Sequence, residues 1–484
     1  MRHSRRGWLD FLSLTIKDEA GNVNRLTLEQ DGHSTDLLTD ARYAPFGPVK
    51  SARLGNGQAL RYGYDTAYRL NELVDGPYRA SITHSAAGNI TALSGTKDPS
   101  DYHYDAADRL VEANSTYGRK AYTYDANSNR LSLDDRAGTT PYGYEPASNR
   151  LQSIGADPVL LDPNGNTTYL NGLGLTYTPD NRLAAVGGET VYQYNALGQR
   201  VGKVFPDGTT EYFIYGVAGQ LLAEIGTDGL PSRQYVYFNG RPFAVWEPGE
   251  PGDKVYYVHA DHLGTPRAVT DANGTSVWEA SPEPFGRTTP NEDPDGDGID
   301  FVFNLRFPGQ YFDAETGLHY NYFRDYDPST GRYTTSDPIG LAGGLNTYTY
   351  ALGNPSRYID PLGLDVVVCF YADAAMGFGH VGFGFPDEGG TMGYYPTGNP
   401  IRSPGEVAED TQNDATCRTI GSDDEQDDCM RNCRLRRQDA PGMYTLAGRQ
   451  CTSFVRDCLR ECGIPAGNYS GPRPRPFFEN LVGQ

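Results

Sequence analysis

A short motif centred on tyrosine recurs through the first half of the chain and restricts its fold more than any other feature. GYDTAYRL, HYDAADRL, TYDANSNRL, GYEPASNRL, TYTPDNRL and QYNALGQRV follow one another between Tyr64 and Val201, at intervals of about twenty residues with some longer steps. Each unit combines a strand tyrosine, a turn of Asp, Asn or Gly, and a return strand, which predicts a β-hairpin. Because one hairpin is only marginally stable, the units must stack edge to edge into a long sheet.

The composition agrees with a mainly β protein. The 484 residues include 58 Gly, 33 Pro and 35 Tyr, and only 38% are apolar, which suits short strands and tight turns. The net charge of −21 argues against a nucleic-acid-binding surface on the large part of the chain, because phosphate contacts need clustered Lys and Arg. The start, MRHSRRGWLDFLSLTIKDEA, lacks the apolar run of a signal peptide, and no later run is long enough to span a membrane. We therefore expect export by another carrier.

Cysteine divides the chain into two unequal parts. The chain up to Leu364 contains no cysteine, whereas the tail, residues 365–484, contains all seven. We therefore expect one large unit and one small unit, with a boundary at the sequence IDPLGL.

Two Asp-Pro-x-Gly-Leu turns lie close to this boundary. Asp337 in SDPIGL and Asp360 in IDPLGL stand 23 residues apart in nearly identical contexts. Two carboxylates brought together can share one proton, so that one acts as a base toward water and the other donates to a peptide carbonyl. The alternative is a plain turn, with Pro fixing φ and Gly taking a positive φ. The residues alone favour the plain turn.

Three longer motifs complete the pattern: YYVHADHLGTPRAVTDANG (256–274), FPGQYFDAETGLHYNYFRDYDPSTGRYTTSDPIGL (307–341) and NTYTYALGNPSRYIDPLGLD (346–365). With the tyrosine repeats, they resemble the rearrangement-hotspot (RHS) proteins and the C components of insecticidal toxin complexes, over residues 40–364. That resemblance implies a β-hairpin spiral forming a hollow shell, or cocoon, around a variable C-terminal toxin. It also implies that Asp337 and Asp360 form a self-cleaving pair assisted by Arg324, and that the cut falls between Leu364 and Asp365.

These observations predict four segments. Residues 1–40 are an N-terminal fragment of the shell, 41–300 the repeat shell, 301–364 the RHS core motif with its self-cleaving seam, and 365–484 the toxin domain.

The tail contains a single histidine, His380 in GFGHVGFGF, and its neighbours alternate as in a strand. Residues 451–462, CTSFVRDCLREC, carry one apolar stripe at helical spacing, which predicts a helix that begins at Cys451. At the N-terminus of a helix, the helix dipole lowers the pKa of a thiol. With His380 as base this is a papain-like arrangement. A structural cysteine and histidine are the alternative.

The sequences around these residues, GHVGFGF and YTLAGRQCTSFVRDCLRECGIP, resemble the permuted papain-like proteins of the NlpC-type and lecithin:retinol-acyltransferase-like families. This resemblance implies a small α+β domain. Gln450 stands where those families frequently have Asn, and we take it as a possible oxyanion donor. The third polar residue that would orient the histidine is not placed.

The other six cysteines have a pairing pattern of their own. Cys429 with Cys433, and Cys458 with Cys462, each share a face of a predicted helix, so two bridges could join the helices. A third bridge, Cys369 with Cys417, would leave Cys451 unpaired. Zinc bound by four thiols is the competing use. Disulfides would suit a periplasm or an extracellular space.

Two further clusters could bind metals. Asp293, Asp295 and Asp297 are spaced as in a calcium loop, but position twelve is Asn304 and no flanking helices are evident, so an acidic turn is favoured. His259, Asp261 and His262 belong to the ADHLGT motif, and we expect them to be structural.

Taken together, the residues and the resemblances predict a secreted bacterial effector that needs no cofactor. It would be made in the cytoplasm and would release a cysteine hydrolase that cuts peptide or amide bonds of peptidoglycan in the periplasm of competitor cells. Its expected partners are a cognate immunity protein and a delivery machine such as a type VI system, and not nucleic acid. The alternatives are an acyltransferase, a lipid hydrolase or a deamidase, and a non-catalytic disulfide-knotted binding module.

Overall fold

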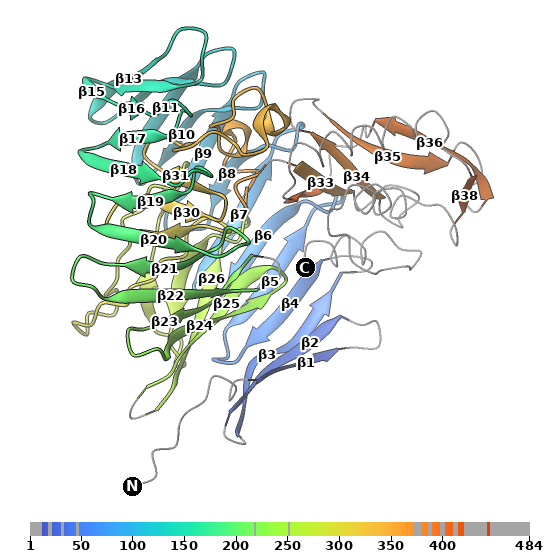
Figure 1. Ribbon diagram of the computed structural model, residues 1–484. Coiled ribbons are helices and arrows are strands. Elements are labelled where there is room, and N and C mark those ends of the chain that lie inside the picture. Colours follow the sequence, from blue (N-terminus) through green and yellow to red (C-terminus); the bar gives the residue numbers. More distant parts are fainter. Residues whose placement is uncertain are drawn as a thin grey trace.

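The computed structural model describes residues 12–17, 22–30, 33–44, 48–216, 219–249 and 252–364, together with six backbone strands between residues 366 and 445. Nearly all described elements are strands, as the composition predicts (Figure 1). Each strand of the large sheets pairs with its neighbours in sequence, so the chain runs as a continuous antiparallel meander.

The first sheet has fifteen strands in sequence order. They are β1 (Leu12–Lys17), β2 (Val23–Gln30), β3 (His33–Tyr43), β4 (Val49–Leu54), β5 (Ala59–Tyr64), β6 (Leu70–Asp75), β7 (Tyr78–His84), β8 (Ile90–Ser94), β9 (Ser100–Tyr104), β10 (Leu110–Ser115), β11 (Gly118–Tyr124), β12 (Arg130–Asp135), β13 (Gly138–Tyr144), β14 (Leu151–Ile154) and β15 (Asp157–Pro158). The predicted boundary at residue 40 falls inside β3, and the sheet continues through it.

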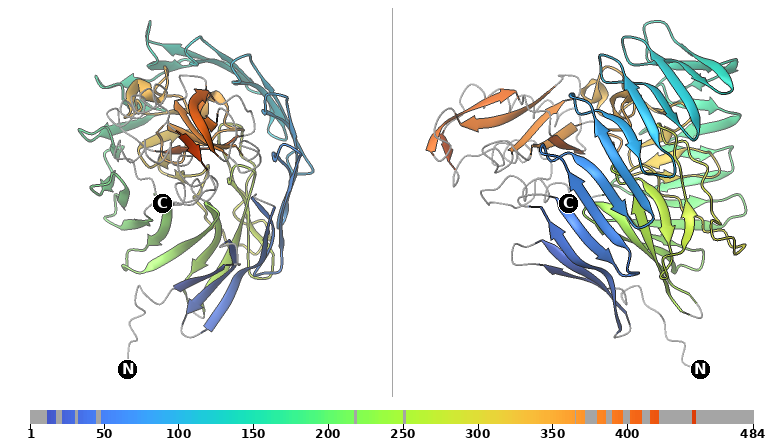
Figure 2. Two further views of the ribbon diagram at one scale, coloured as in Figure 1. Left: turned by 90° about the vertical axis from the view of Figure 1, so that its right-hand side faces the viewer. Right: turned by 180° about the vertical axis from the view of Figure 1, so that it is seen from behind.

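The second sheet has thirteen strands in the same meander order. They are β16 (Leu160–Leu161), β17 (Thr167–Leu170), β18 (Leu173–Tyr177), β19 (Leu183–Val186), β20 (Thr190–Tyr194), β21 (Arg200–Val204), β22 (Thr210–Tyr215), β23 (Leu221–Ile225), β24 (Pro231–Phe238), β25 (Arg241–Glu247), β26 (Lys254–Ala260), β27 (Pro266–Thr270) and β28 (Ser276–Glu279). Seen along their common axis, the two sheets curve around a central space (Figure 2).

The repeat aspartate shapes the hairpin turn. Asp65 Oδ1 accepts the backbone N–H groups of Ala67 and Arg69, each at 2.9 Å, and its Oδ2 accepts Arg69 Nε at 2.8 Å. Tyr68 has a φ of +59°, which closes a type I turn with a bulge, and the register shifts beside the repeat tyrosine. The same two backbone bonds recur in the next two units. The aspartate therefore sets the turn and the register of the hairpins at Asp65, Asp105 and Asp125.

The repeat tyrosine joins five of the six quoted units to the hairpin before them. In these five units its hydroxyl donates to a backbone carbonyl at the start of the preceding return strand. These bonds are Tyr64 to Val49 (2.9 Å), Tyr104 to Ile90 (2.6 Å), Tyr124 to Leu110 (2.9 Å), Tyr144 to Arg130 (2.8 Å) and Tyr194 to Leu183 (2.9 Å). Because such a bond needs a hydroxyl on a long, rigid side chain, the recurring tyrosine is explained by this contact between successive hairpins of the spiral.

The beginning of the first sheet packs against the end of the second. Leu38 and Leu54 from the first sheet share one buried cluster with Trp246 and Tyr257 from the second. A buried polar contact lies beside this cluster, where His259 Nδ1 is 2.9 Å from a carboxylate oxygen of the β6 residue Asp75. Successive turns of the spiral are therefore in direct contact.

A small third sheet lies inside the curve of the two large sheets, where both views place it (Figures 1 and 2). Its strands are β29 (Tyr311–Phe312), β30 (His319–Asn321), β31 (Arg324–Asp327) and β32 (Arg332–Tyr333), and they are followed by the 3-10 helices η1 (Gly340–Gly343) and η2 (Ala351–Gly353). Polar side chains of this segment bond the tyrosine-repeat turns: Arg332 Nη1 donates to Asn129 Oδ1 at 3.0 Å and Asn354 Nδ2 to the carbonyl of Asp108 at 2.8 Å. The segment is therefore anchored to the inside of the shell.

The tail contributes a separate six-stranded sheet in the order β37-β33-β34-β35-β36-β38. Its strands are β33 (Val366–Tyr371), β34 (His380–Phe385), β35 (Gly390–Pro396), β36 (Arg402–Glu409), β37 (Ala415–Ile420) and β38 (Met443–Thr445). The predicted helix at residues 451–462 lies outside the described residues.

Candidate active site

The two Asp-Pro-x-Gly-Leu turns lie on either side of Arg324. Its Nη2 atom is 2.6 Å from Asp337 Oδ2 and 3.2 Å from Asp360 Oδ2, and all three side chains are buried. Arg324 comes from β31, whereas each aspartate follows an irregular stretch near the end of the shell segment. The structure thus brings together the three residues that the sequence motifs singled out.

Each aspartate also caps its own turn. Asp337 Oδ1 accepts the N–H of Ile339 at 3.0 Å, and Asp360 Oδ1 accepts those of Gly363 and Leu364 at 2.7 and 3.0 Å. The turn interpretation is therefore correct as local structure. A turn needs neither a second carboxylate nor a buried arginine, so it does not account for the whole arrangement.

Backbone contacts hold the predicted cleavage segment against these side chains. Arg324 Nε donates to the carbonyl of Gly363 at 2.7 Å, and Leu364 is buried. Gly363 has a φ of +72°, and a Cβ added there would lie 2.8 Å from the carbonyl oxygen of Asn321. Only glycine fits this position without strain. Asp365, on the other side of the predicted cut, lies outside the described residues.

Two neighbouring residues complete the site, and sequence reasoning did not identify them. The Tyr333 hydroxyl donates to Asp360 Oδ2 at 2.6 Å, and Asn321 Nδ2 lies 2.7 Å from that hydroxyl and 2.9 Å from the Asp360 carbonyl oxygen. The Arg324 guanidinium lies over the Tyr333 ring, 3.6 Å from its centroid. Both residues stand in the 307–341 motif, but no spacing in that motif distinguishes them from its other tyrosines and polar residues.

Burial and polar contacts shift the pKa of Asp360 in opposite directions. Burial raises the pKa of Asp360, while the Arg324 charge, the Tyr333 hydroxyl and the two backbone N–H groups act in the opposite direction. Burial, and then the nearby Asp360 carboxylate, raise the pKa of Tyr333 well above its usual value. The tyrosine therefore stays a protonated donor to Asp360.

The tail residues are only partly described. His380 begins β34, as the alternating pattern predicts, whereas Gln450, Cys451 and the proposed bridge partners Cys429, Cys433, Cys458 and Cys462 lie outside the described residues. The register of β33 with β37 places Cys369 directly opposite Cys417. This backbone register is compatible with the expected bridge between them.

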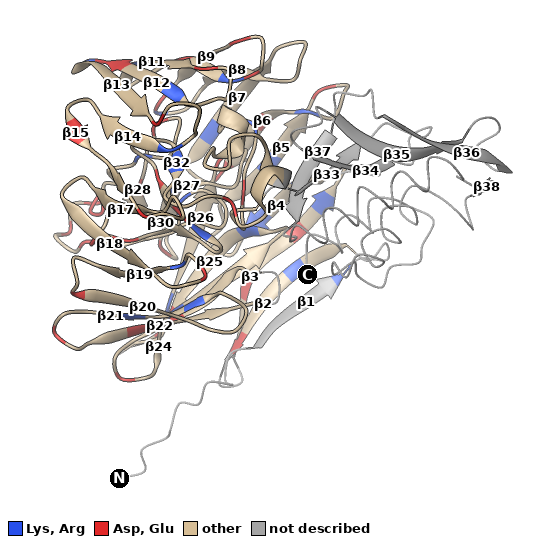
Figure 3. Cartoon of the chain, turned by 45° about the horizontal axis from the view of Figure 1, so that its top comes forward, with Lys and Arg blue, Asp and Glu red and all other residues tan. Residues whose placement is uncertain are grey.

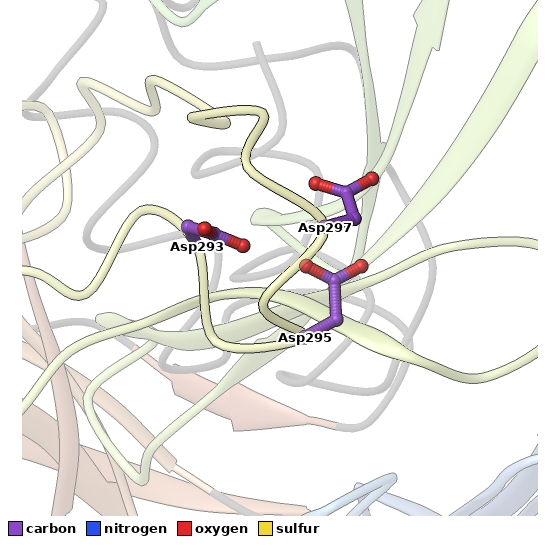
Figure 4. A group of neighbouring side chains, drawn as sticks. All are labelled: Asp293, Asp295 and Asp297. Atoms are coloured by element: carbon purple, nitrogen blue, oxygen red, sulfur yellow. The ribbon is translucent and has the colours of Figure 1, made fainter.

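Asp293, Asp295 and Asp297 point into one small loop (Figure 4). Their carboxylate oxygens lie within 4.8 Å of one another, and Asp295 and Asp297 are exposed. Two of the carboxylates bond their own backbone: Asp293 accepts the N–H groups of Gly296 and Gly298, and Asp297 accepts that of Ile299. These contacts are those of a self-capped acidic turn.

The ADHLGT residues are structural, as expected. His259 bonds Asp75, Asp261 caps its own turn, and His262 Nε2 lies 2.9 Å from the carbonyl oxygen of Ser356. They connect neighbouring parts of the shell and its inner segment.

Acidic residues are spread over the strands and turns of the described chain, and basic residues lie between them (Figure 3). Among the described residues, no helix is long and apolar enough to cross a membrane.

A hairpin spiral around an anchored inner segment defines the protein as a repeat-built β shell. Comparison with known proteins agrees, since the family model described as Teneurin YD-shell matches residues 78–354, more than half of the chain. The chain belongs to the teneurin YD-shell family. The resemblance drawn from the tyrosine motifs is confirmed for the shell.

Two curated relatives carry the word toxin in their names. The toxin protein Tse5 of Pseudomonas aeruginosa is 33% identical over 224 residues, covering 39% of this chain and 17% of that protein. The double-stranded DNA deaminase toxin A of Burkholderia cenocepacia is 32% identical over 243 residues, covering 42% and 16%. The matched segment thus spans about a sixth of each relative.

A solved structure shares the fold. The structure of the Photorhabdus luminescens Tc holotoxin pore aligns with a TM-score of 0.62 and 20% identity, covering 73% of this chain and 20% of that one.

Proposed function

We propose that residues 301–364 form an aspartyl self-cleaving site that cuts the Leu364–Asp365 bond, and that the shell holds and then releases the tail as a toxin. The observation that carries this proposal is the buried contact of Asp337 and Asp360 with one nitrogen of Arg324. Its position, directly before the tail that carries every cysteine of the chain, supports a role in separating the two parts.

The chemistry is an ordinary peptide hydrolysis. One carboxylate takes a proton from water, the water oxygen bonds the Leu364 carbonyl carbon, and the protonated carboxyl polarises the carbonyl oxygen. The carbon–nitrogen bond then breaks, the Asp365 nitrogen takes a proton, and Leu364 becomes a carboxylate. Arg324 supports this division of roles, because a fixed positive charge favours one ionised carboxylate in a buried pair.

The geometry also supports the choice of bond. Asp360 Oδ1 accepts the N–H of Leu364, and Arg324 Nε binds the carbonyl of Gly363. These contacts fix the backbone on the acyl side of the cut next to the two carboxylates. Holding a reacting bond against its catalytic groups supplies much of the rate of such a reaction.

For the tail we propose a cysteine hydrolase in which Cys451 is the nucleophile, His380 its base and Gln450 an oxyanion donor. The sequence pattern and the start of β34 at His380 support this proposal. Peptide or amide bonds of peptidoglycan are its proposed substrate, since the cysteine content favours an oxidising space such as the periplasm. Acyl transfer, lipid hydrolysis and deamidation would use the same pair of residues, whereas a disulfide-knotted binding module would use neither.

A second candidate is a toxin that acts on nucleic acid. The name of the Burkholderia relative, a double-stranded DNA deaminase toxin, favours it. This candidate departs from our expectation of no nucleic-acid partner, which rested on the charge of the shell. In either case we propose a secreted effector with an immunity protein and a delivery machine, and with no cofactor in the self-cleavage.

Aspartate variants test the self-cleavage. The full chain should be recovered as two fragments, the smaller beginning at Asp365, while Asp337→Asn and Asp360→Asn should each remain one intact chain on denaturing gels. Asp327→Asn is a matched control, because Asp327 is a buried aspartate of the same small sheet that bonds Ser329 and Thr330 within its own turn. Cleavage at Leu364 in both active-site variants would refute the mechanism.

A further inference from the structure

Tyr333 is held at the candidate active site on two sides. The Arg324 guanidinium lies over its ring, 3.6 Å from the centroid, and its hydroxyl is 2.6 Å from Asp360 Oδ2. The residue is only 2% exposed. Tyr333 therefore touches both a carboxyl group of the pair and the arginine between them.

A directed chain of hydrogen bonds fixes the hydroxyl. Asn321 Nδ2 donates to the Tyr333 oxygen at 2.7 Å, so the tyrosine hydrogen is free to point at Asp360. The same nitrogen also lies 2.9 Å from the Asp360 carbonyl oxygen. Tyr333 therefore binds the side chain of Asp360, while Asn321 binds its backbone carbonyl.

We infer that Tyr333 is a positioning residue for self-cleavage, whose hydroxyl holds the Asp360 carboxyl in its contact with the Arg324 nitrogen that also binds Asp337. This inference rests on the proposed self-cleavage. A carboxyl group turns freely about its last bond unless its oxygens are bound, and here the tyrosine and the arginine bind one oxygen while the backbone binds the other. Loss of the hydroxyl leaves that carboxyl free to adopt unproductive orientations.

A second consequence concerns pH. The groups that contact the Asp360 carboxyl are Arg324, the Tyr333 hydroxyl and two backbone N–H groups, and Asp337 binds the same nitrogen of Arg324. The hydroxyl donates to the ionised carboxylate, so its removal makes ionisation of Asp360 harder. The part of the rate–pH profile that follows ionisation of Asp360 should therefore have its midpoint at a higher pH when the Tyr333 hydroxyl is removed.

Tyr333→Phe tests the inference, because it removes the hydroxyl and keeps the ring on Arg324. Tyr326→Phe is its matched control: Tyr326 pairs with Tyr333 across β31 and β32, is equally buried, and donates its hydroxyl to the backbone carbonyl of Phe285 at 2.7 Å. The full chains are pulse-labelled by cell-free translation and chased in buffers spanning acidic to basic pH, and the half-time of the intact band is measured.

We expect Tyr333→Phe to cleave about ten- to a hundredfold more slowly, the effect of one hydrogen bond to a charged group, with its midpoint moved to higher pH. Tyr326→Phe should cleave at the parental rate with the parental profile. An unchanged rate and midpoint in Tyr333→Phe would overturn the inference while the aspartate variants remain uncleaved. Cleavage in those aspartate variants would instead overturn the self-cleavage proposal itself.

A second substitution covers the case in which Tyr333→Phe does not fold. Fluorotyrosine placed at position 333 keeps the shape of the side chain and makes its hydroxyl a stronger donor. The midpoint should then move to lower pH, and an unmoved midpoint would overturn the inference.

Discussion

Asp325 lies next to Arg324 in the chain but has the opposite environment. It is buried, its Oδ1 has no hydrogen-bond partner, and burial raises its pKa to about 7 despite the nearby charges of Arg200 and Arg182. We predict that Asp325→Asn stabilises the shell, and that it does so more strongly at pH 8 than at pH 5. The substitution keeps the shape of the side chain and removes only the ability to ionise.

The size and sign of this effect follow from proton linkage. The folded chain keeps a proton on Asp325 up to about pH 7, whereas the unfolded chain loses it near pH 4, so this group makes stability fall as pH rises between those values. The difference between the two pKa values corresponds to roughly 4 kcal/mol well above pH 7, and about 2–3 kcal/mol of that is lost between pH 5 and pH 8. The variant lacks this loss.

Urea unfolding of the full chain, followed by tryptophan fluorescence at pH 5 and pH 8, measures it. Buried Asp313 is the contrasting position, because its contacts with Arg200 and Lys203, at 2.9 and 2.8 Å, help to lower its pKa against the effect of burial. Asp313→Asn should therefore destabilise at both pH values. A parent-to-variant difference for Asp325→Asn that is the same at pH 5 and pH 8 would refute the reasoning.

Three further predictions concern other parts of the chain. Gly363→Ala should slow self-cleavage at least about tenfold, because its Cβ would lie 2.8 Å from the carbonyl oxygen of Asn321. Gly317→Ala is the control, since it has the same φ of +72° and nothing within 4 Å, and it should cleave at the parental rate. Equal rates of the two variants on a gel time course would contradict this prediction. His259→Ala should lower the free energy of unfolding by about 1–3 kcal/mol, because the buried Asp75 Oδ1 loses its histidine partner while Oδ2 keeps the N–H of Ala260; an unchanged urea midpoint would argue against that contact. Cys451→Ala and His380→Ala should each abolish toxicity in susceptible cells while circular dichroism stays parental; a folded Cys451→Ala tail that still kills would support a toxin that does not use this cysteine.

The hairpin spiral could be predicted because its determinants are local. In the turns at Asp65, Asp105 and Asp125, the capping aspartate and the residue of positive φ after it stand within four positions, as at Asp65 and Tyr68. The contact between successive turns could not, since Asp75 and His259 are 184 residues apart and only the curvature of the sheets brings them together. Neither residue has a pattern that marks it as a contact.

Some residues of the candidate site could be predicted from the sequence and others could not. The pair Asp337 and Asp360 could be found because a turn motif occurs twice, and Arg324 because the resemblance named its position. Tyr333 stands 27 residues before Asp360, and its role depends on the direction in which β32 presents its ring. A tyrosine among 35 in the chain carries no signal for that.

The most direct test of the central claim is the origin of the oxygen at the new C-terminus. When the full chain is translated in heavy-oxygen water, the tryptic peptide YIDPLGL that ends at Leu364 should be present and should carry one heavy oxygen atom in its carboxylate. The Asp337→Asn and Asp360→Asn chains should yield no such peptide. A labelled peptide that begins at Tyr358 and ends at Leu364 from both variants, or its absence from the parent, would contradict hydrolysis by the aspartate pair.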